Sequence, residues 1–260
     1  MPDDPRYADE KEQVPTNLRL LMLLEEVVAA AGPVTPTKAN AGLGLPKPTL
    51  HRLFHTLEAE GFLQRDIDGR SYGPGPRLRR LSVHTLSAQR VRAARLVILR
   101  ALADDIGETC NIAIPDRERM VYLDRVETKW PLRIQLPIGS TVPFHATASG
   151  KMYLSSLKER ALERILTSIA LPPNTDRTLT DADALRREVE AIRTRGYSTD
   201  DEEFMEGMTA IAVPILDDMG RLVSTLSVHG PIQRNTVSDL IQHLPKLRNA
   251  GRELAATLME

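Results

Sequence analysis

The sequence predicts an α+β protein with two structured parts, a smaller helical part followed by a larger part built on an antiparallel sheet. Through residues 17–107, apolar residues recur mainly at helical spacing, with a single hairpin pattern among them. From residue 111 onward, apolar strand-like runs flank short charged turns and alternate with helical stretches. That second pattern is typical of α+β domains with antiparallel strands.

The composition is that of a folded protein and excludes several classes. Of the 260 residues, 42% are hydrophobic and 27% are charged, which suits a chain that buries a sizeable core. The single cysteine, Cys110, excludes an internal disulfide and a thiolate-based zinc finger, and we expect it to pack in the core. No apolar run approaches the roughly 20 residues that a membrane span needs. Residues 1–16 are acidic and polar, unlike a signal peptide, so we expect a flexible arm on a cytoplasmic protein.

Charge is segregated along the chain, although the formal net charge is only -1. Residues 17–103 carry 13 basic and six acidic side chains, a net charge of +7. Residues 104–260 carry 19 basic and 24 acidic side chains, a net charge of -5. A basic part followed by an acidic part is expected when only the first meets a polyanion.

Three helices are predicted at the start of the basic part. Residues 17–31 are good helix formers with leucines at helical spacing, and a Gly-Pro pair follows them. A short helix over 36–41 opens with Thr35 as its N-cap and a proline as its first residue. A third helix begins near Pro48, runs to residue 60 and ends before Gly61.

The third helix has one apolar and one basic face. The apolar residues recur at i, i+3, i+4 and i+7: Leu50, Leu53, Phe54 and Leu57. Arg52 lies opposite them, flanked by His51 and His55. A short helix, a tight turn and a helix with a basic outer face form a helix-turn-helix, whose second helix enters the major groove of DNA.

A hairpin follows around Asp68-Gly69, with Arg70 and Tyr72 on its return strand, and completes a winged helix-turn-helix over residues 17–76. We expect Lys47, at the start of the third helix, to contact phosphate. The residues expected to contact double-stranded DNA are Lys47, Pro48, Thr49, His51, Arg52, His55, Arg70 and Tyr72.

Two further helices are predicted between the two parts. A linker helix over 77–89 directs Leu78, Leu81 and Leu86 inward. The residues expected to face the core from the next helix, which opens the C-terminal part at residue 90, are Val91, Leu96, Leu99 and Leu102.

The C-terminal part contains two hairpin patterns. NIAIP and MVYLDRV flank the turn DRER, LRIQL (132–136) is expected as a third strand, and TAIAVPIL and LVSTLSVHG flank DDMG. The stretches with helical spacing are 158–167, 181–195 and 237–258, the last interrupted or restarted at Pro245.

The segment LPIGSTVPFHATASGKMYL (136–154) is a candidate ligand site. Its small residues permit close approach to the backbone, and a helix is expected to start at Gly150, where free N–H groups bind anions. Downstream, STDDEEFMEGMTA (198–210) places four consecutive carboxylates in a loop, which we expect to be solvated.

Two alternatives remain open for this part. His145, Asp200 and His229 could converge on a metal ion, giving a metal-dependent sensor or a small-molecule enzyme. The C-terminal part could also bind no ligand and serve assembly alone.

The stretch GLGLPKPTLHRLFHTLEAEGFL (42–63) resembles the recognition-helix signature of the IclR family of bacterial transcription regulators. Pro48 departs from it, because the family usually has a serine there. HATASGK, RGYSTDDEE, AVPILDDMG and LSVHGPI resemble the family's effector domain, in the same order, so the resemblance extends from Asn17 over nearly the whole chain.

The resemblance implies a DNA-binding regulator rather than an enzyme, with no cofactor and no resident metal. It implies a GAF-like effector-binding domain over 90–260 that takes small organic acids or aromatic metabolites. It also implies dimers formed through the DNA-binding domains, and often tetramers formed through the effector domains. The implied pocket positions are Leu136, Ala148, Ser149, Asp200, Ala210, Ser227 and His229.

These expectations combine into one hypothesis of mechanism. A small carboxylate sits at the helix start near Ala148 and Ser149, and Ser227 and His229 donate hydrogen bonds to it. His229 departs from the serine of the best-known family members. A symmetric dimer reads a palindromic operator, and its affinities for effector and operator are reciprocally coupled.

Overall fold

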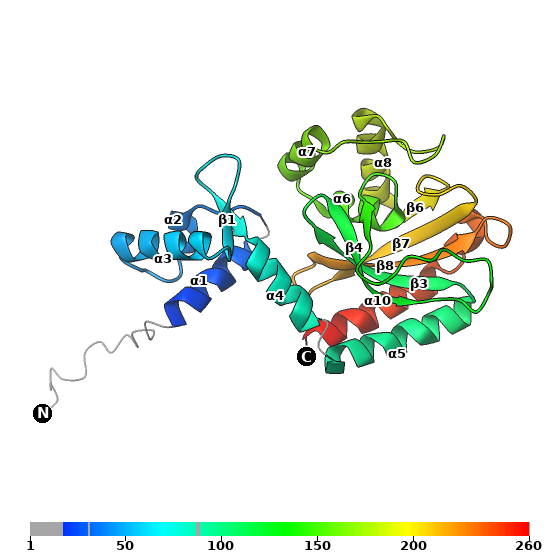
Figure 1. Ribbon diagram of the computed structural model, residues 1–260, viewed down its shortest axis with the longest axis horizontal. Helices are drawn as coiled ribbons and strands as arrows, with labels where there is room; N and C mark the ends of the chain where they lie inside the picture. Colours follow the sequence, from blue (N-terminus) through cyan, green and yellow to red (C-terminus); the bar gives the residue numbers. More distant parts are fainter. Residues whose placement is uncertain (1–17, 31, 87–88, 260) are drawn as a thin grey trace, which may run out of the picture. The chain divides into compact units, whose positions relative to one another are not determined.

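The computed structural model describes residues 18–30, 32–86 and 89–259, and the chain divides into two units, Met1–Ser82 and Val83–Glu260 (Figure 1). The acidic arm expected over residues 1–16 lies outside the described residues. None of the helices in the described ranges is both long and apolar enough to cross a membrane.

Among the described residues up to residue 75, the chain forms three helices and a two-stranded hairpin, as the sequence predicts. These elements are α1 Leu18–Ala29, α2 Pro36–Ala39, α3 Lys47–Ala59, β1 Leu63–Arg65 and β2 Tyr72–Pro74. Pro36 is the first residue of α2 and Gly61 has the left-handed φ of +73° expected after α3. Thr35 occupies the N-cap position of α2, but its side chain accepts no hydrogen bond there, so it caps the helix by position only.

The core of the first unit forms where α3 meets α1 and the hairpin. All four residues of the predicted apolar stripe are buried: Leu50, Leu53, Phe54 and Leu57. They share one cluster with Leu23 and Val27 of α1 and with Leu63 and Tyr72 of the hairpin. The two faces of α3 therefore have different roles, because the stripe holds the helix in place and the opposite face remains in solvent.

Two helices follow the hairpin, α4 Pro76–Leu86 and α5 Gln89–Ile106. Leu99 and Leu102 of α5 are buried, as predicted. Leu81 of α4 is 54% exposed, so the expectation that it faces inward is wrong. The side chains of Leu86 and Val91 lie outside the described residues.

The second unit is built on a six-stranded antiparallel sheet in the order β5-β4-β3-β8-β7-β6. The strands are β3 Thr109–Asp116, β4 Arg119–Val126, β5 Thr141–Pro143, β6 Ser198–Asp201, β7 Met208–Leu216 and β8 Leu222–Pro231. Both predicted hairpins are present, as β3–β4 and β7–β8.

Two strand expectations are wrong. LRIQL (132–136) is not a strand; the third strand along the chain of this sheet is β5, a few residues later. Ile134 is nevertheless buried, and its carbonyl oxygen accepts a hydrogen bond from the Arg125 guanidinium instead of a ladder bond. The acidic segment expected as a loop begins with β6, which pairs with β7 at the edge of the sheet.

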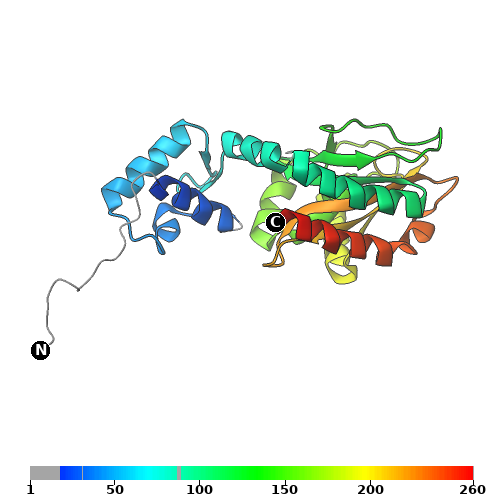
Figure 2. The same cartoon turned by 90° about the horizontal axis from the view of Figure 1, so that it is seen from below.

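Helices cover both faces of this sheet (Figures 1 and 2). The helices that complete the second unit are α6 Ala148–Ser156, α7 Glu159–Ser168, α8 Ala182–Arg195, α9 Val237–Ile241 and α10 Leu244–Met259. Helices α5 and α10 run side by side along one face, and α6 contacts the strands from the other. The predicted interruption near Pro245 is confirmed, since α9 ends at Ile241 and Pro245 lies in the first turn of α10.

The two faces of the sheet differ in polarity. The face under α5 and α10 is apolar and contributes Ile112, Ile211, Leu226 and Val228 to the largest core cluster. The residues alternating with these face α6, and several are polar and fully buried, among them Asn111 and Ser227. Buried polar groups need hydrogen-bond partners, so the face under α6 is the candidate ligand site.

Candidate DNA-binding surface and effector site

Helix α3 presents most of the residues predicted to contact DNA. The exposed ones are Lys47, Pro48, His51, Arg52 and His55, and Thr49 is half-buried. Among the described residues, Lys47 and Arg52 form no ion pair, so both charges are available to a polyanion. The apolar stripe on the opposite side anchors the helix, so this face keeps a fixed direction.

The hairpin adds one further cation. Arg70 lies in the turn between β1 and β2, not on the return strand as expected, and it is exposed. The carboxylate of Asp68 fixes this turn by accepting from the backbone N–H groups of Arg70 at 2.8 Å and Ser71 at 2.7 Å. Arg70 is therefore held at the tip of a rigid hairpin.

Tyr72 is a core residue. It is only 6% exposed, and its ring lies 4.8 Å from that of Phe54. Its hydroxyl donates to Glu58 at 3.3 Å, and Arg65 covers the ring while pairing with Glu58 at 2.8 Å. We leave Tyr72 out of the proposed DNA surface, because its side chain joins the hairpin to α3.

Strand register brings the predicted effector positions of the second unit together. Ala210 of β7 pairs with Asp200 on one side and His229 on the other. Ser227, two residues before His229 on β8, lies on the same face. Helix α6 crosses this face, and Ala148 shares a cluster with Ala210. Leu136 is partly buried against the neighbouring cluster that contains Tyr122.

His229 is buried and neutral in this site. Its Nε2 lies 3.0 Å from Ser227 Oγ, and its ring meets that of Tyr122 edge-on at 6.3 Å. Burial, reinforced by the nearby positive charge of Arg125, lowers the pKa of His229 to about 3. A neutral imidazole carries one N–H donor and one acceptor, so the Ser227–His229 pair can donate one hydrogen bond onward.

Asp200 is buried instead of solvated. Its Oδ1 accepts from the backbone N–H groups of Glu203 at 2.8 Å and Phe204 at 3.2 Å. Burial raises its pKa to about 7, although the nearby Lys151 ammonium acts in the opposite direction. Lys151 of α6 pairs with Glu203, so the acidic segment divides into two buried carboxylates and two more exposed ones, Asp201 and Glu202.

Helix α6 begins two residues earlier than predicted, at Ala148, over the polar face of the sheet. Thr147 is its N-cap and accepts from the N–H of Gly150 at 3.1 Å. Ser198 of β6 donates to the carbonyl of Ala148 at 2.6 Å and so ties this end to the sheet. Ser149 is only 1% exposed, and its hydroxyl has no hydrogen-bond partner among the described residues.

Three residues of this face were missed by sequence reasoning: Asn111, Tyr122 and Arg125. All three are buried, and they come from the first hairpin, β3–β4. No residue of this hairpin is among the site positions predicted from the sequence. Asn111 interrupts an otherwise apolar run, and that polar residue was the signal that could have identified the face.

The structure does not assemble the metal site considered from the sequence. His145 Nε2 lies 3.0 Å from the carbonyl oxygen of Pro172, whereas His229 is engaged by Ser227. Within the described ranges, no three His, Cys, Asp or Glu residues lie close enough together to hold a metal ion. Cys110 is fully buried, as expected, and burial raises the pKa of its thiol.

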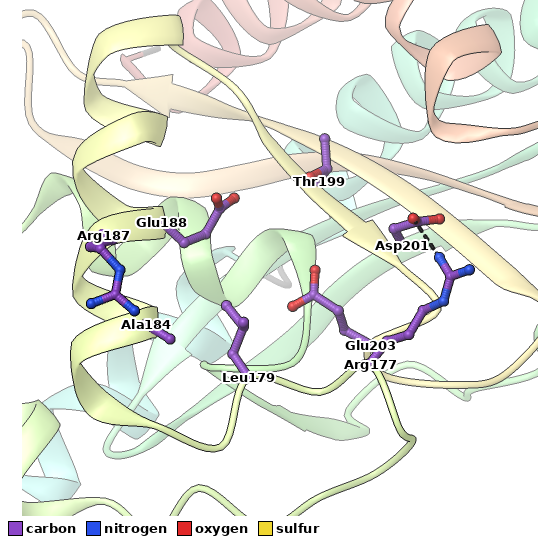
Figure 3. A pocket seen from close by; sticks show the side chains of 8 residues that line it. All are labelled: Arg177, Leu179, Ala184, Arg187, Glu188, Thr199, Asp201 and Glu203. Atoms are coloured by element: carbon purple, nitrogen blue, oxygen red, sulfur yellow. Dashed lines mark hydrogen bonds and ion pairs between the residues drawn. The ribbon is translucent and has the colours of Figure 1, made fainter.

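An open hollow of about 440 Å³ lies between α8, β6 and the segment before α8 (Figure 3). Its lining residues are Arg177, Leu179, Ala184, Arg187, Glu188, Thr199, Asp201 and Glu203. Most of its charges are already paired, Arg177 with Asp201 at 2.7 Å and Glu188 with Arg195 at 2.6 Å. None of the predicted effector residues lines this hollow.

Comparison with known protein families identifies both units. Residues 18–66 match the IclR helix-turn-helix domain, and residues 83–256 match the C-terminal domain of the bacterial transcriptional regulator IclR. The chain belongs to the IclR family. The two matches contain α3 and the polar face under α6, whereas Arg70 of the hairpin lies beyond the end of the first match.

Individual relatives agree with this assignment. A probable transcriptional regulator SauR of Cupriavidus necator is 38% identical over 94% of this chain and 96% of its own. The crystal structure of the Thermotoga maritima IclR is similar with a TM-score of 0.63 and 28% identity, over 94% of this chain and 98% of that one. An IclR homolog of Microbacterium hydrocarbonoxydans in complex with 4-hydroxybenzoate has a TM-score of 0.60 and 26% identity, over 94% and 99%.

Family membership establishes the general function. The protein is a transcriptional regulator with an N-terminal DNA-binding helix-turn-helix and a C-terminal effector-binding domain. The family consists of DNA-binding regulators rather than enzymes, so the metal-dependent sensor or small-molecule enzyme considered above is not favoured.

Proposed function

We propose that this IclR-family regulator binds a palindromic operator as a dimer or tetramer and is controlled by a small carboxylate held between α6 and the polar face of the sheet. The observation that carries the proposal is the buried hydroxyl of Ser149, which has no partner among the described residues, in the first turn of α6. Leaving such a group unpaired costs about 1–3 kcal/mol, which a ligand oxygen can recover.

The donors around this position favour an anion. The first turn of a helix directs backbone N–H groups and the positive end of its dipole outward. Ser149 and the Ser227–His229 pair add side-chain donors. The 4-hydroxybenzoate bound to the Microbacterium homolog is a carboxylate, which supports this choice of class.

Thermal unfolding tests the effector site, with 4-hydroxybenzoate and acetate as probes. We expect at least one probe to raise the melting temperature of the wild type, and Ser227→Ala and His229→Ala to abolish that shift. Ser224→Ala is the matched control, because Ser224 is a buried serine on the same strand but on the opposite face of the sheet from Ser227 and His229. Unchanged shifts in the two site variants would move the ligand elsewhere. No shift with any metabolite would favour a domain that serves assembly alone.

DNA recognition centres on Arg52, which lies on the exposed face of α3. If it contacts a base, Arg52→Ala weakens operator binding by about 1–3 kcal/mol and changes binding to random DNA little. Arg100→Ala, an exposed arginine on α5, is the control and should leave both affinities unchanged. Equal losses on operator and random DNA would make Arg52 a phosphate contact.

Dimerisation has support on α1. Leu18, Leu21 and Val28 are 44%, 55% and 52% exposed, which leaves an apolar strip on a helix whose other side fills the core. A second copy could cover this strip and give the dimer the two-fold symmetry of a palindrome. Leu21→Glu should shift the sedimentation coefficient toward a smaller species and weaken binding to a full operator more than to a half-site. A cytoplasmic location follows from this function, since operator DNA lies there.

A further inference from the structure

Asn111 occupies the middle of β3 on the same face of the sheet as the effector positions. Its partner on β8 is Ser227, and its partner on β4 is Arg125. The residue is polar but completely buried, and its neighbours along the strand are the apolar residues Cys110 and Ile112. A side-chain amide in such a place is costly unless both of its ends find hydrogen-bond partners.

One end of this amide is fixed by Arg125. The Arg125 guanidinium donates to Asn111 Oδ1 at 3.0 Å, and it also donates to Glu127 Oε1 and to the carbonyl oxygen of Ile134. A guanidinium has only donors, so the oxygen of the amide must face Arg125 and the amide cannot turn over. Arg125 itself is held in place by three acceptors from three different residues.

The other end of the amide is a donor, so it cannot bond to Arg125, which has only donors. Asn111 Nδ2 is buried and has no hydrogen-bond partner among the described residues. Neither Ser227 nor His229, which bond to each other, accepts from this donor in the structure. The hydroxyl of Ser149 on α6 is the second buried group on this face without a partner. Two unpaired groups on facing elements indicate a ligand that bonds to both.

We propose that Asn111 is a specificity-determining residue of the effector site, whose amide donates to an oxygen of the effector. The proposal rests on the effector site proposed above and identifies a residue outside its predicted positions. Since Arg125 holds the oxygen end, the site can offer only N–H donors here. It accepts ligands with a carboxylate or carbonyl oxygen at this point and disfavours those with an N–H group.

Asn111→Asp tests the proposal with almost no change in shape. The aspartate keeps the contact with Arg125 and replaces the N–H donor with an oxygen. We expect the affinity for a carboxylate, measured by isothermal titration calorimetry with 4-hydroxybenzoate or acetate, to fall on the order of tenfold to a hundredfold. Urea unfolding of the variant without ligand checks that the fold is kept.

Selectivity separates a contact with the ligand from a purely structural role. The wild type should prefer 4-hydroxybenzoate over 4-hydroxybenzamide, which carries N–H groups in place of an oxygen. Asn111→Asp should reduce or reverse this preference, because its oxygen accepts from the amide. Asn111→Leu, which removes both ends of the amide, should weaken carboxylate binding without improving amide binding. Ser224→Ala should behave as the wild type.

The outcomes distinguish this inference from the proposal it rests on. If the wild type binds neither acetate nor 4-hydroxybenzoate, the carboxylate site is overturned and the role of Asn111 with it. Suppose instead that the wild type binds a probe, that His229→Ala weakens this binding, and that Asn111→Asp changes neither affinity nor selectivity. The effector site then stands, and the inference about Asn111 is wrong. An ordered water bonded to Asn111 would give that second result.

Discussion

At the scale of single residues, burial sets the charge of the two titratable groups closest to the effector positions. Burial raises the pKa of Asp200 to about 7 and lowers that of His229 to about 3. The charged groups facing Asp200 are Lys151, which lowers its pKa, and Glu203, which raises it. Near neutral pH, His229 is uncharged and Asp200 is partly protonated, so an anion entering the site meets little repulsion.

These two shifts act on stability in opposite directions. Between its ordinary pKa of 3.8 and about 7, Asp200 holds a proton in the folded chain and not in the unfolded one. The free energy of unfolding therefore falls as pH rises through this window. Between about 3 and its ordinary pKa of 6.5, His229 binds a proton only in the unfolded chain. The free energy of unfolding therefore falls as pH falls through this second window. From about pH 4 to 6.5 the two nearly cancel.

Asp200→Asn should remove the effect of Asp200 on the pH dependence of stability and leave that of His229. The asparagine oxygen still accepts from the N–H groups of Glu203 and Phe204, but it does not titrate. We therefore expect the free energy of unfolding of the variant to rise relative to wild type from pH 4 to pH 7, by about 1.4 kcal/mol per pH unit. Urea unfolding at a series of pH values measures this difference.

The matched control is Asp201→Asn, because Asp201 is the next residue on the same strand and its side chain is 50% exposed. This change breaks only a surface ion pair with Arg177, which contributes little, so the variant should lack the pH-dependent gain in stability expected of Asp200→Asn. A flat difference between Asp200→Asn and wild type would mean that Asp200 is charged in the folded protein throughout this range.

At the scale of elements, the start of α6 depends on close packing between two backbones. The small residues of HATASG suggested close approach of a ligand. At Gly150 it is the chain itself that approaches, because a Cβ there would lie 2.4 Å from the Cα and carbonyl oxygen of Phe144. Gly150 therefore lets α6 lie against the segment before it, which places Ala148 and Ser149 over the sheet.

Gly150→Ala should destabilise the second unit by about 1–3 kcal/mol, since backbone atoms cannot move aside as a flexible side chain can. It should also weaken effector binding by displacing the first turn of α6. Gly251→Ala on α10 is the control, because a Cβ there meets Pro214 at an ordinary 3.6 Å. Alanine favours helix over glycine, so the control should be neutral or slightly stabilising in a thermal melt. Equal behaviour of the two variants would contradict the packing role of Gly150.

The sequence predicts those elements whose ends have strong local signals. The turn at Asp68-Gly69, the charged turn before Arg119 and the glycine turn before β8 all define hairpins that the structure contains. LRIQL failed because alternation alone does not supply a neighbouring strand, and an arginine side chain took up the Ile134 carbonyl instead. Strand β6 was missed because its residues, STDD, are polar although two of them are buried.

The candidate site was predictable in part for the same reason. Asp200, Ala210, Ser227 and His229 share the face under α6 only because β6, β7 and β8 are neighbours in register. Resemblance to the family supplied those positions, and local spacing could not. Asn111 and Arg125 lie on strands whose apolar pattern gave no reason to look for a ligand, and only strand pairing brings them to Ser227.

At the scale of the whole molecule, the basic segment extends beyond the first unit, because four of its 13 basic residues lie on α5 in the second unit. The basic residues 17–103 include all the exposed residues proposed to contact DNA, and the acidic remainder carries the effector site. Helix α4 crosses the boundary between Ser82 and Val83, so the units are joined by helical chain. Regulation requires that the effector have different affinities for the DNA-bound and free states, because a ligand with equal affinity for both shifts nothing.

This requirement gives a prediction that needs no knowledge of how the units move. If a saturating carboxylate probe changes the operator affinity by some factor, saturating operator must change the probe affinity by the same factor, by thermodynamic linkage. Fluorescence anisotropy of a labelled operator gives the first ratio, and calorimetric titration of the probe into the protein–operator complex gives the second. A coupling of about 5–150-fold is typical.

His229→Ala should leave operator binding unchanged but insensitive to the probe. If the wild type binds the probe and its operator affinity does not change, that ligand occupies the site without regulating the protein.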